Sequence, residues 1–178
     1  DLSVGSIMAV VICACGMFSV SGKNPFLVIL LGLILGAAIG LANGFLVAKM
    51  KLQPFIATLG TCEALRGVAF MMTGGWPVLS IPHEFRDTLN APTPVGGIRI
   101  FVFVMIAAAI LYAFILGRTK AGTYFYAIGA NEDATKLSGV NTDKFKMLAY
   151  MLCGIGAAMA GMVTLARLGA GEPSAGTG

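Results

Sequence analysis

The sequence predicts an all-α integral membrane protein, built as a polytopic helical bundle. Hydrophobic residues make up 57% of the 178 residues and charged residues only 11%, so too few polar side chains exist to cover a water-soluble core. Several segments are apolar over about 20 residues, the length that a helix needs to cross a bilayer. We therefore expect a single transmembrane domain over residues 1–178, with about five spans.

The expected spans follow one another along the chain and are separated by short turns or polar loops. They are Ser3–Ser21, Phe26–Ala48, Pro54–Thr73, Ile98–Gly117 and Phe145–Leu168. Glycines recur every fourth residue in the second span, at Gly32, Gly36, Gly40 and Gly44. Small residues at this spacing form one helix face against which another backbone can pack closely. Ordinary packing inside a bundle explains this face, and an interface that slides during transport is the alternative.

The connections between the spans predict the orientation of the chain. Residues 74–97 form a proline-rich loop, with one short helix expected after Pro82, and residues 118–146 form a second polar loop. Loop parity places seven basic residues on one side: Lys49, Lys51, Arg118, Lys120, Lys136, Lys144 and Lys146. The other side has four: Lys23, Arg86, Arg99 and Arg167. The positive-inside rule then makes 118–146 cytoplasmic and 74–97 periplasmic.

Composition and motifs argue against a cofactor, a metal site or a nucleic-acid partner. The net charge of +4 is dispersed over the loops, whereas nucleic-acid binding needs a basic cluster. The cysteines lie in apolar segments without CxxC spacing, and the single histidine lies alone in a polar loop. A GxxxxGK[ST] phosphate-binding loop is absent from the sequence, so we do not expect this chain itself to be an enzyme that hydrolyses ATP.

The third span contains two charged residues, Glu63 and Arg66, spaced to lie on one helical face. Charges inside a span are costly and usually functional. One interpretation is a self-neutralising ion pair that joins two helices. The other is that Arg66, together with Thr58 and Thr61, lines or braces a polar pathway.

A short polar helix is expected at Asn131–Ser138, within the sequence GANEDATKLSG. Asn131 is a suitable N-cap, Glu132 and Asp133 fall in the first turn, and Gly139 suits the left-handed terminating position. A helix of about two turns is marginal without tertiary contacts. It either docks into a partner, with its acids facing basic residues and Leu137 in an apolar spot, or packs only against its own bundle.

At this point the sequence resembles a known family. GRTKAGTYFYAIGANEDATKLSGVNTDKFK is similar to the cytoplasmic loop of permease subunits of sugar-type ABC importers, which carry ribose, galactose, xylose, arabinose or autoinducer-2-like substrates. DLSVGS, PFIATLGT…LRG and ARLGAGEPSAGTG resemble other stretches of that family in the same order. The resemblance covers nearly the whole chain. Family chains are longer, with spans before DLSVGS and after SAGTG, so we expect a chain incomplete at both ends.

The resemblance implies partners and site residues. The short helix would be the coupling helix that contacts an ATP-binding subunit, through Gly129, Asn131, Glu132, Ala134, Leu137, Ser138 and Gly139. DLSVGS and GEPSAGTG would lie near breaks in the membrane helices, beside a translocation pathway that could include Asp1, Ser3, Thr58, Thr61, Arg66, Ser174 and Thr177. A second permease copy and a periplasmic sugar-binding protein would complete an importer of the bacterial inner membrane. The alternative is a secondary transporter of small polar solutes, which needs ion-coupling carboxylates inside the membrane.

Overall fold

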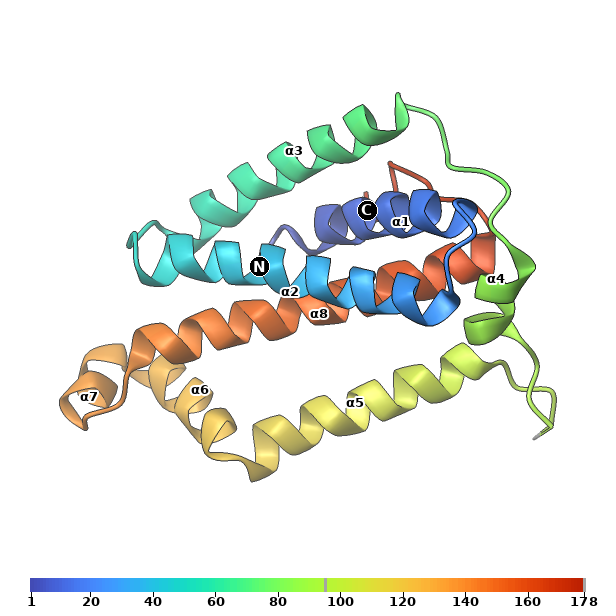
Figure 1. Cartoon of the computed structure of the whole chain (residues 1–178). Helices are drawn as coiled ribbons and strands as arrows, with labels where there is room; N and C mark the ends of the chain where they lie inside the picture. Colours follow the sequence, from blue (N-terminus) through green and yellow to red (C-terminus); the bar gives the residue numbers. More distant parts are fainter. Residues whose placement is uncertain (95, 178) are drawn as a thin grey trace.

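The computed structural model describes residues 1–94 and 96–177, and its regular elements in these ranges are all helices (Figure 1). The helices are α1 (Val4–Val20), α2 (Pro25–Ala48), α3 (Pro54–Thr73), α4 (His83–Asn90), α5 (Ile100–Arg118), α6 (Lys120–Ala130), α7 (Glu132–Leu137) and α8 (Thr142–Leu168). Extended pairing in the described residues is limited to two isolated antiparallel bridges, Val78 with Gly171 and Pro92 with Arg99. The predicted all-α class is therefore confirmed.

Four helices, α2, α3, α5 and α8, are long and apolar enough to cross a membrane. The fifth predicted span, Ser3–Ser21, is a shorter apolar helix of 17 residues, Val4–Val20. Its N-cap is Ser3, whose backbone amide and hydroxyl donate to the Asp1 carboxylate at 2.8 and 2.7 Å. Helix α1 is nevertheless the most enclosed element, with Ile7, Val11 and Ile12 fully buried, so it lies inside the bundle rather than at its edge.

The centre of the bundle is the packing of α2 against α8, which run alongside each other (Figure 1) and touch from Gly32 to Gly44 of α2. All four stripe glycines of α2 are buried, and a Cβ added at Gly36 or Gly40 would overlap the backbone carbonyls of Gly154 or Tyr150. The predicted glycine face is thus a backbone-to-backbone contact. Such a contact leaves no room for a side chain at these glycines of α2.

Two of the long helices remain largely uncovered. Helix α5 has no buried residue, and α3 buries only Ala57, Thr58 and Ala69. Figure 1 shows α5 running beside α8 at a distance, joined to it through α4 at one end and α6 at the other. Apolar faces of this size suit contact with lipid or with another protein, and in water they would promote association.

The segment 118–146 contains a helix that the sequence analysis treated as loop. Helix α6 spans Lys120–Ala130. Its N-cap is Thr119, whose hydroxyl accepts a hydrogen bond from the Gly122 amide at 3.3 Å. It is held against α8 by aromatic contacts, with Tyr124 and Phe125 ring centroids 4.7 and 6.3 Å from that of Phe145. Helix α8 accordingly begins at Thr142, three residues before the predicted Phe145.

Two predictions about the connections are confirmed. Helix α4 (His83–Asn90) follows Pro82 as expected, and its Phe85 is 1% exposed against the core. At the opposite end of the bundle, Lys49 and Lys51 of the α2–α3 turn both contact Asp143 at the start of α8. The α2–α3 turn and the 118–146 segment therefore lie at the same end of the bundle, as loop parity predicted.

Candidate functional site

The predicted short helix forms as α7 and is closed at both ends. The Asn131 side chain accepts a hydrogen bond from the Ala134 amide at 2.9 Å, which makes it the N-cap. At the other end the Gly139 amide donates to the Lys136 carbonyl at 2.9 Å, and Gly139 has φ +82°. A side chain other than glycine or asparagine is strained at such a φ, so both predicted caps are confirmed.

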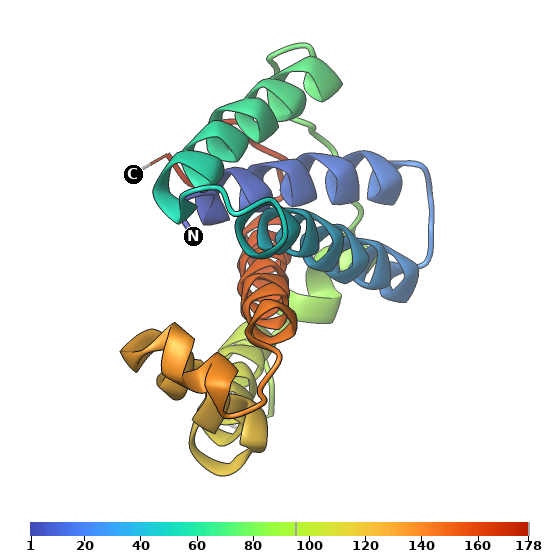
Figure 2. The same ribbon diagram turned by 90° about the vertical axis from the view of Figure 1, so that its left-hand side faces the viewer.

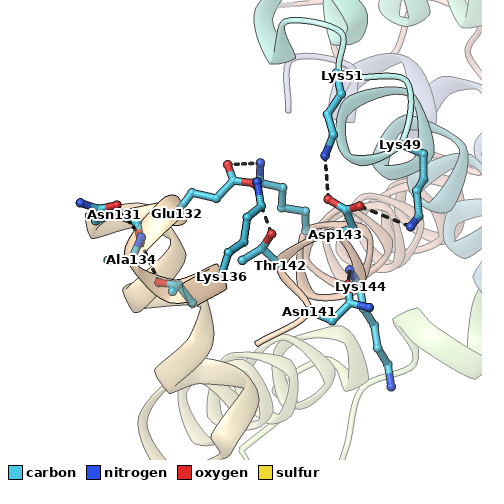
Figure 3. Close-up of polar contacts among 12 residues, drawn as sticks. Lys49, Lys51, Asn131, Glu132, Ala134, Lys136, Asn141, Thr142, Asp143 and Lys144 are labelled. Carbon is cyan, nitrogen blue, oxygen red and sulfur yellow. Dashed lines mark hydrogen bonds and ion pairs between the residues drawn. The ribbon is translucent and has the colours of Figure 1, made fainter. Parts of the chain in front are cut away.

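The Glu132 carboxylate lies within the chain and does not face outward as the sequence analysis expected. It contacts Lys136 Nζ at 2.9 Å and accepts a hydrogen bond from Thr142 Oγ1 at 3.3 Å, and it pairs with Lys146 (Figure 3). Lys146, followed by Lys136, lowers the pKa of Glu132 from 4.5 to about 2. Glu132 therefore joins α7 to the first turns of α8.

The free surface of α7 is small and partly apolar. The Leu137 residue is 90% exposed, and Asp133, Ala134 and Ser138 are also exposed, while Thr135 is the one buried residue of the helix. An unpartnered leucine at the tip of a capped helix is suited to insertion into an apolar depression on another protein. Gly129 lies apart from this surface, because it is in α6 and lines a small cavity between α6 and α8.

At the start of α1, polar side chains form a second group. Asn43 of α2 donates to Ser3 Oγ at 2.7 Å and to the Asp1 carboxylate at 3.4 Å, and both Asn43 and Ser3 are fully buried. The Asn43 Oδ1 atom is buried and has no hydrogen-bond partner in the described residues. Sequence analysis placed Asp1 and Ser3 on the pathway but missed Asn43, because it sits within an otherwise apolar span.

Residues after α8 form a non-helical segment that packs back into the bundle. Gly169 ends α8 with φ +65°, and Gly171 exchanges two backbone hydrogen bonds with Val78 at 2.8 and 2.9 Å. Further along, the backbone of Gly176 meets that of Gly5 so closely that neither position has room for a side chain. The segment therefore ends beside the polar start of α1.

Arg66 of α3 holds this segment in place. Its Nη1 atom donates to the carbonyl oxygens of Pro173 and Ala175, at 2.9 and 2.7 Å. Irregular backbone at membrane depth needs partners for its polar groups, and the guanidinium supplies two of them. The predicted Glu63–Arg66 ion pair is wrong: Glu63 is exposed and forms no ion pair in the part of the chain that the structure describes.

The remaining predicted pathway residues are less directly connected. Thr58 and Thr61 donate to carbonyls of their own helix, at 2.9 Å from Thr58 to Pro54 and at 3.1 Å from Thr61 to both Ala57 and Thr58. Thr61 and Asn43 also line one cavity of about 340 Å³ between α2 and α3. Ser174 and Thr177 bond locally within the C-terminal segment. The structure thus joins Asp1 with Ser3, and Arg66 with the Ser174 segment, whereas the hydrogen bonds of Thr58 and Thr61 stay within α3.

Sequence comparisons find relatives along the whole chain. Residues 1–178 match the protein family described as the permease component of branched-chain amino acid transport systems. The ribose import permease protein RbsC of Escherichia coli K12 is 41% identical over 187 residues, which cover 100% of this chain and 56% of the relative. The D-allose transport system permease protein AlsC of Escherichia coli K12 is 34% identical, over 100% of this chain and 54% of the relative.

A third relative, the autoinducer 2 import system permease protein LsrC of Escherichia coli K12 / DH10B, is 35% identical over 100% of this chain and 52% of its own length. The chain spans about half the length of the curated relatives that it matches. No solved structure matches it. Because the family match extends over the full sequence, this multi-pass membrane chain belongs to the family of transport-system permease components.

Proposed function

We propose that this chain forms part of the transmembrane permease subunit of an ATP-driven sugar importer in the bacterial inner membrane. The family description names branched-chain amino acids, whereas the relatives at 34–41% identity are named for ribose, allose and autoinducer 2 import. Similarity at that level along the whole chain favours a sugar or a sugar-like molecule as the substrate. Ribose is the first sugar to test.

The observation that carries the proposal is α7. It is a six-residue helix, capped at both ends, that stands at the same end of the bundle as the lysine-rich α2–α3 turn. Its one large apolar side chain, Leu137, is 90% exposed. A helix this short is only marginally stable by itself. Forming it before it docks lowers the entropy cost of binding a partner, so its caps suit a docking element. We assign that partner as an ATP-binding subunit, which would supply the ATP hydrolysis that drives transport.

The pathway would run beside the two non-helical ends of the chain. Asp1, Ser3 and Asn43 supply buried polar groups at the start of α1, and Arg66 fixes the backbone near Ser174. Helix breaks of this kind place carbonyls and hydroxyls at membrane depth, where a sugar needs hydrogen-bond partners. In an alternating-access cycle, movement of α7 would tilt α8 and so change which side these groups face.

Two further partners complete the proposed importer. A second permease copy would enclose the pathway, and α5, which has no buried residue, offers an apolar surface for protein or lipid. A separate periplasmic sugar-binding protein would select the substrate. A secondary transporter is the less favoured function, because Glu63 lies exposed on α3 and the relatives are named as import permeases.

The experiment uses the full-length permease with its ATP-binding subunit and its binding protein in proteoliposomes. Uptake of labelled D-ribose, D-allose and D-fructose is measured with ATP inside the vesicles and again without it. We expect ATP-dependent uptake of at least one sugar, and we expect Gly139→Val to abolish it because valine is strained at φ +82°. Gly139→Asn, which tolerates that φ, is the matched control and should retain uptake. Uptake that needs an ion gradient but no ATP would contradict the proposal.

A further inference from the structure

We propose that Glu132 and Asp143 act as positioning residues that connect α7, through the first turn of α8, to the α2–α3 turn. We call this arrangement the lysine–carboxylate link: Glu132 between Lys136 and Lys146, and Asp143 between Lys49 and Lys51. The inference rests on the proposed function, since it explains how movement of a docked α7 would reach the rest of the bundle. The residues of the link are separate from the exposed face of α7 that carries Leu137.

The first half of the link joins α7 to α8. Glu132 is the first residue of α7, and its carboxylate contacts Thr142 and Lys146, which lie one helical turn apart on the same face of α8. Lys136, from the last turn of α7, approaches the same carboxylate at 2.9 Å. Thr135 is the one buried residue of α7, and the Glu132 carboxylate, steadied by Lys136, makes the hydrogen bonds that reach α8.

The second half joins α8 to the α2–α3 turn. Asp143 contacts Lys49 Nζ at 3.3 Å through one carboxylate oxygen and Lys51 Nζ at 2.8 Å through the other. Lys49 caps the end of α2, and Lys51 has φ +59°, an unusual conformation for a residue with a long side chain. The contact with Asp143 gives this conformation a physical reason, since it aims the Lys51 ammonium at the start of α8 (Figure 3).

The two halves use different faces of one helical turn. Thr142 and Lys146 face α7, whereas Asp143, rotated by about 100° from Thr142, faces the α2–α3 turn. A displacement of α7 is therefore passed to the end of α2 and to the beginning of α3 in series. Helix α3 carries Arg66, which holds the C-terminal segment, so the link ends at the proposed pathway.

The link matters for geometry more than for folding stability. The two lysines of the turn have side chains that are 51% and 58% exposed, and ion pairs this exposed contribute little to stability. Removing either carboxylate should leave the bundle folded but loosen its movement with α7. We expect transport per ATP hydrolysed to fall about two- to fivefold in each variant, because each variant removes two ion pairs and exposed pairs have small effects.

The first test measures D-ribose uptake and ATP hydrolysis by the full transporter in proteoliposomes. Glu132→Gln and Asp143→Asn should each lower uptake per ATP, and the Lys49→Met/Lys51→Gly variant should reproduce Asp143→Asn. Lys144→Gln is the matched control, because Lys144 is an exposed lysine of the same turn that forms no ion pair in the described residues. If the halves act in series, the Glu132→Gln/Asp143→Asn double variant falls no further than the worse single variant. The link would be overturned if the double variant lost uptake per ATP by the product of the two single losses. It would also be overturned if the single variants lost no more than Lys144→Gln does.

A second test needs no sugar and so separates the link from the transported substrate. Spin labels are placed by unnatural amino acids at Asp133 of α7 and at Gln53, both exposed, in the complete transporter with its ATP-binding subunit. The parent should give a narrow distribution of label-to-label distances in both the nucleotide-free and the vanadate-trapped states. Asp143→Asn should broaden it while Lys144→Gln does not. An unchanged distribution in Asp143→Asn would overturn the inference, even where ATP-dependent uptake proves the proposed function right.

Discussion

At the scale of single residues, two charged side chains, Glu132 and Arg66, gain their roles from partners distant in the sequence. Arg66 donates to carbonyls 107 and 109 residues further along the chain. Glu132 meets Lys146 beyond the end of its own helix. In both cases the nearest opposite charge along the helix was a plausible partner, and for Arg66 it was the wrong one. The Arg66 guanidinium instead donates to backbone carbonyls of the non-helical segment, which have no helical partners.

The Arg66 contacts predict a large cost when the guanidinium is removed. Arg66→Met leaves the part-buried Pro173 and Ala175 carbonyls without this donor, and an acceptor left unsatisfied where it is fully buried costs roughly 1–3 kcal/mol. We expect the thermal unfolding temperature of the detergent-solubilised permease to fall by several degrees. Arg118→Met is the control, since Arg118 is exposed at the end of α5, and it should melt like the parent. Equal melting of the two variants would show that the Arg66 contacts are not structural.

The lysines around Glu132 predict an unusual titration. Its folded-state pKa of about 2 lies below the ordinary value of 4.5, so its pairing stabilises the fold fully above about pH 4.5 and is lost as pH falls towards 2. With 13Cδ-labelled glutamate, the NMR resonance that disappears in Glu132→Gln should titrate well below pH 4. Lys146→Met should move that midpoint upward. A midpoint near 4.5 in the parent would contradict the pairing.

At the scale of elements, the α2–α8 seam and the caps of α7 were predictable because both depend on local spacing. Glycines four residues apart predict a face for close helix packing, and Asn131 and Gly139 mark the start and the end of α7. Helix α6 was missed for the opposite reason. Its two glycines, Gly122 and Gly129, weaken its intrinsic helix propensity, and its stabilising contact with Phe145 is tertiary. The role of Asn43 was missed for the same reason, because its hydrogen-bond partners, Asp1 and Ser3, are distant in the sequence.

The seam predicts that bulk is tolerated at some glycines and not at others. A side chain at Gly36 or Gly40 meets backbone of α8, whereas the space around Gly60 and Gly67 of α3 is empty. Gly36→Leu and Gly40→Leu should each destabilise the solubilised permease by about 1–3 kcal/mol or prevent its folding, as overpacking does. Gly60→Leu and Gly67→Leu should have little effect on bundle packing. If all four variants melt together, the α2–α8 seam is not close-packed.

For the whole molecule, a compact group of α1, α2 and α8 is flanked by the less buried α3 and α5, with α7 at one end (Figures 1 and 2). The asymmetry fits a subunit whose outer helices meet lipid or other chains. The distribution of basic residues over the connections predicts its sidedness. In sealed vesicles, a membrane-impermeant thiol reagent should label a cysteine at Lys51 only from the cytoplasmic side, and one at Arg86 only from the periplasmic side. Labelling of both from one side would contradict this topology.

The central claim is that α7 docks on an ATP-binding subunit, and photocrosslinking tests it most directly. A photoreactive phenylalanine is placed at Leu137, which is 90% exposed, or at the controls Met71 and Phe26, which are 77% and 73% exposed. Both controls lie on apolar spans away from α7. In membranes containing the complete transporter, we expect a crosslink to the ATP-binding subunit from position 137 alone. A crosslink absent from position 137, or formed equally from 71 and 26, would contradict the account.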